Sequence, residues 1–197
     1  RGIVMNKESA YEFGLEDNSG RLQGAFGPGC WRWWGSVTIP LNIWTHVAVG
    51  QDGKNERHFV NGDFVEQDAC PGSLTINDEN FKIGARGGNG GHSSQFRGSV
   101  DEAMLFDSCL HEAGVATVYS SFSGGSALAV SSLPHTLIGY WPLDDDGSDS
   151  EDRPVRALFS GQSEAREDDS VAELRRVESA LSKGHYRFTI TVTDKIS

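Results

Sequence analysis

Short apolar segments with alternating polar positions follow one another through the first 120 residues. Tyr11, Phe13 and Leu15 are separated by single polar or small residues, and the alternation resumes after a polar turn at 17–20. Successive side chains of a strand point to opposite faces of a sheet, so this alternation predicts strands with one buried face. Turn residues recur at the intervals typical of sandwiches. The pattern therefore predicts an antiparallel β-sandwich.

The clearest hairpin signal is Asn61-Gly62. Segments 44–49 and 57–60 are predicted to be adjacent strands, and the Asn-Gly pair then reverses the chain into 63–65. Asn-Gly between apolar strands favours a two-residue turn, because both residues tolerate positive φ. We therefore expect three consecutive antiparallel strands here.

Five short motifs occur in a fixed order within residues 2–120. They are WTHVA (44–48), VNG (60–62), KIGA (82–85), FRGSVDE (96–102) and LF (105–106). Together they resemble the laminin G-like, concanavalin A-like jelly roll. The resemblance implies an all-β fold of two antiparallel sheets, with a short helical turn near 110–120 that closes the domain.

Such domains usually open with an aromatic-rich strand, and nothing of that kind precedes Arg1. Its look-alike LIGYWPLD occurs at 137–144. This segment either folds back to complete the first domain, which would leave no unpaired sheet edge, or opens a second repeat. The predicted organisation is a jelly roll over 1–145, an acidic and polar linker over 146–169, and a helix plus strand over 170–197 at the edge of a further module.

The C-terminal segment contains two different signals. A capping box at 170–173 followed by helical spacing predicts a helix, and the alternation over 185–193 predicts a strand. Residues 181–194 also resemble the final hairpin of PKD-type immunoglobulin-like modules, which would make the preceding segment a strand instead of a helix.

The charge of the chain restricts its partners. There are 28 acidic against 17 basic residues, a formal net charge of -11. This charge disfavours nucleic acid and anionic membranes as partners and favours divalent cations. No apolar stretch approaches the roughly 18 residues that a membrane-spanning helix needs, so we expect no membrane insertion by this segment.

Calcium is the metal that the residues favour. In domains of the resembling family, the Asp of the FRGSVDE-type strand takes part in a calcium site, which corresponds to Asp101. The other ligands would come from the acidic segment after 141 if it folds back, because carboxylates and loop carbonyls are the oxygens that Ca²⁺ prefers. The candidate ligands are Asp101, Asp144, Asp146 and Asp149.

A tryptophan cluster is the candidate ligand-binding surface. Alternation sends Trp31 and Trp33 to one face and Trp34 to the other, so at least one indole should face solvent or cover a loop. Exposed indoles stack on sugar rings or on apolar protein patches, whereas core packing would explain two of the three. Arg32 would lie at the rim of either kind of site.

The three cysteines allow one disulfide. Cys30 and Cys70 both flank predicted turns at sheet edges, so this pair is favoured over other pairings, with three free thiols as the alternative. Cys109 would then be buried or paired outside this chain.

No catalytic pattern emerges. Glycoside hydrolysis needs two carboxylates across a groove, but Asp101 and Glu102 are consecutive and should point to opposite sheet faces. Glu12 lies on a turn-flanked edge without partners nearby in sequence. His46 alternates with apolar neighbours, which favours a hydrogen-bonded structural histidine over a catalytic base.

These patterns predict a non-catalytic recognition or adhesion module of a larger extracellular or cell-surface protein, with calcium-assisted binding of a glycan or an extracellular protein. Neighbouring domains of the same protein or assembly are further expected partners. Two alternatives remain at this stage: a structural building block of an extracellular assembly, and a degenerate glycoside-hydrolase-like domain.

Overall fold

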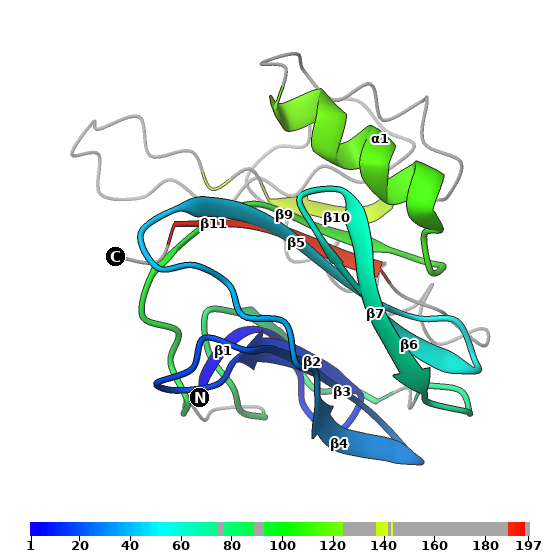
Figure 1. Cartoon of the computed structure of the whole chain (residues 1–197). Coiled ribbons are helices and arrows are strands. Elements are labelled where there is room, and N and C mark those ends of the chain that lie inside the picture. Colours follow the sequence, from blue (N-terminus) through cyan, green and yellow to red (C-terminus); the bar gives the residue numbers. More distant parts are fainter. Residues whose placement is uncertain (75–76, 89–92, 124–136, 142, 144–188, 196–197) are drawn as a thin grey trace, which may run out of the picture.

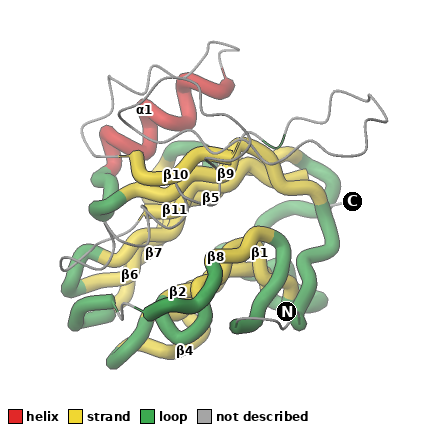
Figure 2. The backbone as a smooth tube through the Cα atoms, turned by 180° about the vertical axis from the view of Figure 1, so that it is seen from behind, coloured by secondary structure: helices red, strands yellow, loops and turns green. Residues whose placement is uncertain are grey.

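The computed structural model describes residues 1–74, 77–88, 93–123, 137–141, 143 and 189–195. These residues form two antiparallel sheets that face each other, and one helix lies outside the larger sheet (Figures 1 and 2). The predicted two-sheet antiparallel sandwich is therefore confirmed.

The smaller sheet is built mainly from the beginning of the chain. Its strand order is β4-β3-β2-β1-β8, so its first four strands are neighbours both in sequence and in space. The polar turn between β2 and β3 is closed by Asn18 and Gly20, which both adopt positive φ. The strands are β1 (Gly2–Lys7), β2 (Tyr11–Leu15), β3 (Leu22–Phe26), β4 (Cys30–Trp34) and β8 (Phe81–Ile83).

The larger sheet combines strands from the middle and the end of the chain. Its order is β10-β9-β11-β5-β6-β7, so β11 lies between two strands that precede it by many residues. The backbone of β11 pairs with β5 on one side and β9 on the other. The strands are β5 (Trp44–Gln51), β6 (Asn55–Val60), β7 (Asp63–Ala69), β9 (Ser99–Phe106), β10 (Leu137–Trp141) and β11 (Thr189–Lys195).

The Asn61-Gly62 turn joins β6 to β7 as predicted. Asn61 has φ +51° and Gly62 has φ +86°, the combination that a two-residue hairpin of this hand requires. Gly62 also packs against Tyr119 of the helix, since a Cβ at this glycine would lie 2.8 Å from the Tyr119 ring. Glycine is therefore required at position 62 both by the positive φ of the turn and by the close approach of Tyr119.

Apolar side chains form two clusters, one on each side of the larger sheet. The first fills the space between the sheets and includes Phe13, Val49 and Leu105. The second lies between the larger sheet and helix α1 (Glu112–Ser123) and includes Phe59 and Val118. Full burial of such a side chain contributes about 1.5–3 kcal/mol. The predicted helical turn is thus a helix of 12 residues that covers the outer face of the larger sheet.

The segment that the sequence analysis placed in either of two domains forms strand β10. It pairs with β9 at one edge of the larger sheet, and the Trp141 ring stacks on Phe81 of the smaller sheet at 5.0 Å. The strand predicted over 185–193 is described over 189–195 as β11. The acidic linker over 146–169 and the helix signal at 170–173 lie outside the described residues, and the domain boundaries stay predictions.

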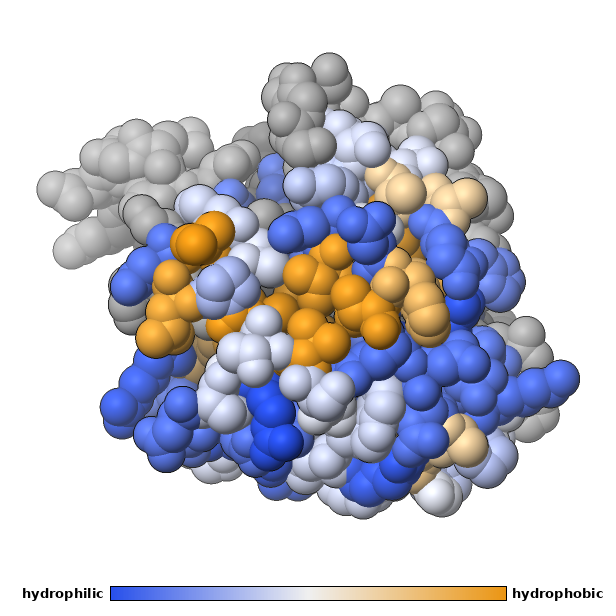
Figure 3. All heavy atoms as spheres, in the orientation of Figure 1, coloured by the Kyte–Doolittle hydropathy of each residue, from blue (hydrophilic) through white to orange (hydrophobic). Residues whose placement is uncertain are grey.

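Several large apolar side chains remain at the surface. Figure 3 shows apolar atoms gathered on the face seen in Figure 1, among strongly polar surroundings. The exposed large side chains on strand β7, at the start of β5 and in the loop before it are Leu41, Ile43, Trp44, Phe64 and Val65.

Candidate functional site

Strand β4 directs alternate side chains to opposite sides of the smaller sheet. Cys30 forms a disulfide with Cys70, at the end of the larger sheet's strand β7, and the Trp34 ring lies 5.0 Å from the ring of His58 on β6. Trp31 and Trp33 point the other way, to the outer face. The alternation predicted for the three tryptophans is therefore present, with two indoles outside and one between the sheets.

Each outward indole is accompanied by a guanidinium group. The Arg86 guanidinium carbon lies 5.9 Å from the ring centre of Trp31, and that of Arg1 lies 4.1 Å from the ring centre of Trp33. Attraction between a cation and an aromatic face contributes about 0.5–1 kcal/mol at an exposed site. Trp31 is 38% exposed and Trp33 is partly buried. We call Trp31, Trp33, Arg1 and Arg86 the outer-face site.

Buried polar side chains hold these two arginines in place. Glu12 Oε2 lies 3.1 Å from Arg86 Nε and accepts a hydrogen bond from Asn6 Nδ2 at 3.0 Å. Glu8 pairs with Arg86 Nη2 at 3.3 Å. Arg1 Nη2 donates to Gln23 Oε1 at 2.8 Å. The guanidinium groups are thus fixed over the indoles by residues of β1, β2 and β3.

Glu12 is the most unusual of these supporting residues. It is 1% exposed, and no described residue forms a hydrogen bond to its Oε1. Burial raises the pKa of Glu12 to about 7, although the nearby Arg86 opposes that change. The predicted edge position of Glu12 is wrong, because β2 lies between β3 and β1 in the sheet. Its ion-pair partner, Arg86, is distant in sequence.

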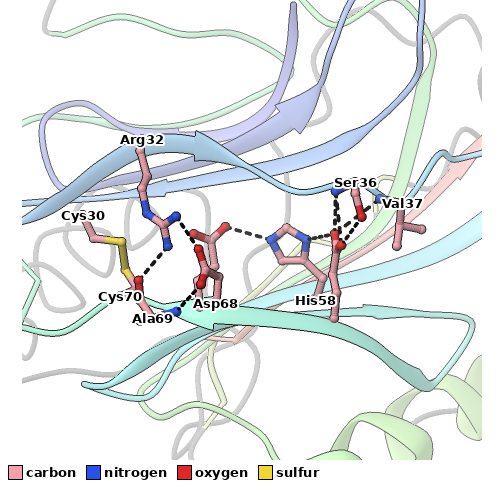
Figure 4. A network of polar contacts seen from close by, with 10 residues as sticks. Cys30, Arg32, Ser36, Val37, His58, Asp68, Ala69 and Cys70 are labelled. Carbon is pink, nitrogen blue, oxygen red and sulfur yellow. Dashed lines mark hydrogen bonds and ion pairs between the residues drawn. A yellow bond between two sulfur atoms is a disulfide. The ribbon is translucent and has the colours of Figure 1, made fainter.

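The inward side of β4 has a different role, seen in Figure 4. Arg32 pairs with Asp68 and donates to the backbone carbonyl oxygen of Ala69 at 2.6 Å. Both acceptors belong to β7, so this arginine links the two sheets beside the disulfide. Arg32 and Trp34 therefore lie on the opposite face from Trp31 and Trp33, and the four predicted ligand-binding residues do not form one surface.

His58 lies at the centre of this inner layer. Its side chain is fully buried, with Nδ1 3.0 Å from Glu66 Oε1 and Nε2 2.8 Å from Glu56 Oε1. Burial alone would lower the pKa of His58, but the two carboxylates raise it above its ordinary value. The two carboxyl groups therefore favour the protonated form of the His58 ring.

The two carboxylates have contrasting environments. Burial would raise the pKa of Glu66, but hydrogen bonds from His58 and Ser36 lower it to about 2. Ser36 donates its backbone N–H to Glu66 Oε1 at 2.9 Å. Glu56 is fully buried, and burial raises its pKa despite the bond to His58. This layer therefore connects the two sheets.

The disulfide is the pair that the sequence analysis favoured. Cys30 and Cys70 are both buried, and their Cα atoms are 5.3 Å apart. Cys109 is buried and forms no disulfide with any described residue. The disulfide therefore links strand β4 of the smaller sheet covalently to the end of strand β7 in the larger sheet.

The predicted calcium ligands are only partly described. Asp101 Oδ1 accepts the backbone N–H of Glu102 at 2.9 Å, and Glu102 adopts φ +52° at a bulge of β9. The bulge interrupts the simple alternation assumed for these two residues. Within the described ranges Asp101 belongs to no group of three candidate metal ligands, and the other three predicted ligands, Asp144, Asp146 and Asp149, lie outside those ranges.

His46 is structural, but in a different way from the one predicted. It is 2% exposed and its ring lies 5.4 Å from that of Tyr119. Neither ring nitrogen has a hydrogen-bond partner among the described residues, so the expected hydrogen bond is absent. Burial lowers the pKa of His46 to about 4.

Comparison with known proteins assigns this architecture to a family. A laminin G family model, described as the concanavalin A-like lectin/glucanases superfamily, matches residues 1–116. Neither the curated proteins nor the solved structures contain a match. No helix in the described ranges has the length and apolar character that crossing a membrane requires.

Proposed function

Because the chain belongs to the concanavalin A-like lectin/glucanase superfamily, whose laminin G-like domains are carbohydrate- or protein-binding modules, we propose that it is a non-catalytic module that binds a glycan at the outer-face site. The observation that carries this proposal is the pair of outward indoles, Trp31 and Trp33, each with a fixed guanidinium group beside it. Indoles offer flat apolar faces to the C–H side of a sugar ring.

The polar part of the site suits sugar hydroxyl groups. Arg86 keeps a third of its side chain exposed while two of its nitrogens are occupied by Glu8 and Glu12. A guanidinium has five N–H donors in a fixed geometry, so donors remain for a ligand. A ligand meeting such prepositioned donors loses less entropy on binding, because the protein groups are already ordered.

The proposal of a non-catalytic role rests on the state of the carboxylates near the indoles. Glu12 has a side chain with no exposed area and is paired with Arg86. A catalytic pair must reach the glycosidic oxygen and the anomeric carbon from two sides. Release of new reducing ends from a bound glycan would overturn this part of the proposal and favour the glycoside-hydrolase alternative.

The test is a glycan array followed by calorimetric titration of any ligand found. We expect Trp31→Ala and Trp33→Ala each to weaken binding by at least about tenfold, which equals about 1.4 kcal/mol. Trp44→Ala is the matched control, because Trp44 is 44% exposed on the larger sheet. No ligand on the array, or equal losses in all three variants, would contradict the proposal.

We also propose that calcium assists binding through Asp101. Support comes from the register of β10, which places Trp141 opposite Ala103. Ala103 is two residues from Asp101, and the acidic segment begins at Asp144, three residues after Trp141. Carboxylates from both segments would supply the oxygens that Ca²⁺ needs. The test is Ca²⁺ titration of the wild type and of Asp101→Asn, for which we expect at least about tenfold weaker Ca²⁺ binding. Equal affinities would exclude Asp101 as a ligand.

An extracellular or cell-surface location completes the proposal. A buried disulfide supports it, because such bonds persist in oxidising compartments. The laminin G-like family is typically extracellular, and we propose the same for the larger multidomain protein to which this module would belong. Secretion of the chain with Cys30 and Cys70 oxidised is the expected result, and a reduced pair in the native protein would contradict it.

A second candidate function, a structural building block, is favoured by one observation. Leu41 is 66% exposed, Ile43 is 57% exposed, and both precede the exposed Trp44 in the same short segment. Apolar side chains gathered in this way indicate a contact surface for protein. Concentration-dependent association that is abolished by Ile43→Ser, together with an empty glycan array, would favour this candidate.

A further inference from the structure

The disulfide lies against a buried carboxylate, Glu56, one oxygen of which has no hydrogen-bond partner among the described residues. One carboxylate oxygen of Glu56 and the sulfur atoms of Cys30 and Cys70 all lie within 4.8 Å of one another. Glu56 is 0% exposed, and its Oε2 has no hydrogen-bond partner among the described residues. Leaving a buried acceptor unpaired costs about 1–3 kcal/mol, and more for a charged group.

The surrounding residues make room for this carboxylate and orient it. A Cβ at Gly24 would lie 2.2 Å from Glu56 Oε1, so this glycine leaves room for the carboxylate in its present position. His58 Nε2 binds Glu56 Oε1 at 2.8 Å, and Glu66 binds the other ring nitrogen. A ligating carboxylate whose position is set by further hydrogen bonds is the arrangement found around protein metal sites.

We propose that the dithiol form of this chain binds a thiophilic divalent cation, with Zn²⁺ as the expected ion, through Cys30, Cys70 and Glu56. Two thiolates and one carboxylate are ligands that Zn²⁺ accepts, and three protein ligands leave one tetrahedral position for water. The disulfide and the metal are alternative occupants of the same sulfur atoms. The site is therefore present in the chain before oxidation and is lost when the disulfide forms.

Conversion of the disulfide form into the zinc-bound form takes two steps. A dithiol reductant transfers two electrons and two protons to the two sulfur atoms, the S–S bond breaks, and the reductant becomes a disulfide. Zn²⁺ then displaces the two thiol protons to solvent and binds the thiolates and the Glu56 carboxylate. The bound set carries a net charge of minus one. The His58 ring contacts its carboxylate, and the Arg32 guanidinium group lies beside the two sulfur atoms (Figure 4).

The experiment uses the full chain, reduced with a phosphine without oxygen and titrated with Co²⁺ and then Zn²⁺. We expect thiolate-to-cobalt charge-transfer absorption that Zn²⁺ abolishes, and no absorption in the oxidised chain. Cys30→Ser should lose the charge-transfer band, and Glu56→Gln should weaken Zn²⁺ binding by at least about tenfold. Cys109→Ser is the control for thiol content and should behave as the wild type.

Two results would overturn the proposal. One is the absence of charge-transfer absorption in the reduced wild type. The other is equal Zn²⁺ affinity of the wild type and Glu56→Gln, which would mean that two thiols alone bind the ion. If the reduced chain loses its β-sheet circular dichroism, Zn²⁺ should restore it in the wild type and not in Cys30→Ser, and binding without such recovery would also overturn the proposal.

Discussion

The two sides of strand β4 carry side chains of similar chemistry with opposite consequences. On the inner side, Arg32 and Trp34 contact the larger sheet through an ion pair and a ring contact. On the outer side, Trp31 and Trp33 contact arginines and remain accessible. An indole and a guanidinium therefore join the two sheets on one side and stay accessible to the proposed ligand on the other. Whether the residue has an odd or an even position along the strand decides which side it faces.

Along this single strand, substitutions on the inner side should change the free energy of unfolding, and substitutions on the outer side should change the proposed ligand binding. Inner side chains pair with residues of the opposite sheet, so their removal costs folding free energy. Outer side chains pair with residues whose support comes from within the smaller sheet, so their removal leaves the interface between the sheets intact. Variants on the two sides should therefore affect different measurements.

The largest effect is expected from the covalent link on the inner side. The double variant Cys30→Ser with Cys70→Ser opens a loop with a sequence separation of 40, which should lower the free energy of unfolding by about 4 kcal/mol. Urea unfolding followed by circular dichroism measures the loss, and Cys109→Ser is the control. A loss no larger than that of the control would show that the inner side does not dominate stability.

A smaller effect concerns Glu66, also on the inner side. Its pKa of about 2 in the folded chain lies below its ordinary value of 4.5, so the stability it contributes is present above pH 4.5 and is lost as the pH falls toward 2. Because Glu66 lies near the surface, solvent screening reduces the contribution to about 1–2 kcal/mol. Glu66→Gln should unfold more easily than the wild type at pH 7, and the difference should shrink to about a quarter of that value at pH 2.5. Parallel curves for the two proteins across this range would contradict the assignment.

Glu12 beneath the outer-face site should show the opposite sign. Its folded pKa of about 7 lies above the ordinary value of 4.5, so its contribution is present below pH 4.5 and is lost as the pH rises through 7. Glu12→Gln should equal the wild type at pH 4.5 and exceed it by up to about 3 kcal/mol at pH 8. Urea unfolding at these two pH values gives the comparison, and a wild type that is the more stable protein at pH 8 would refute it.

The smallest effect on stability is expected from the outer indole itself. Trp31→Ala removes a side chain that is 38% exposed together with its contact to Arg86, so the free energy of unfolding should fall by only about 1 kcal/mol. The same urea experiment measures it. A loss above 2 kcal/mol would mean that Trp31 is part of the folded core, and the separation of the two sides would fail.

The features predicted from the sequence are those set by neighbouring residues. The Asn61-Gly62 turn, the alternation along 30–34 and the β-sandwich depend on local backbone preference and on period-two burial. The Cys30–Cys70 pair was favoured because both residues flank turns at sheet edges. Each signal comes from residues within a few positions of it, although the two cysteines are 40 positions apart.

The features that the sequence did not predict depend on distant contacts. Arg86 pairs with Glu12, which is 74 positions away in the chain, and no motif near either residue predicts this pairing. The unpaired ring of His46 depends on Tyr119, which the helix brings to it. A charged residue within an apolar alternation, such as Glu12, was the one available signal, because its burial required a partner from elsewhere.

The position of the disulfide also has a mechanical consequence. A pulling force transmitted along the backbone would pass from Cys30 to Cys70 through the sulfur atoms, so residues 31–69 would carry no tension while the bond is intact. This bypass withholds roughly 140 Å of contour length from extension. Trp31 and Trp33 lie within the bypassed segment, so their strand would not be directly stretched when the ends of the chain are pulled.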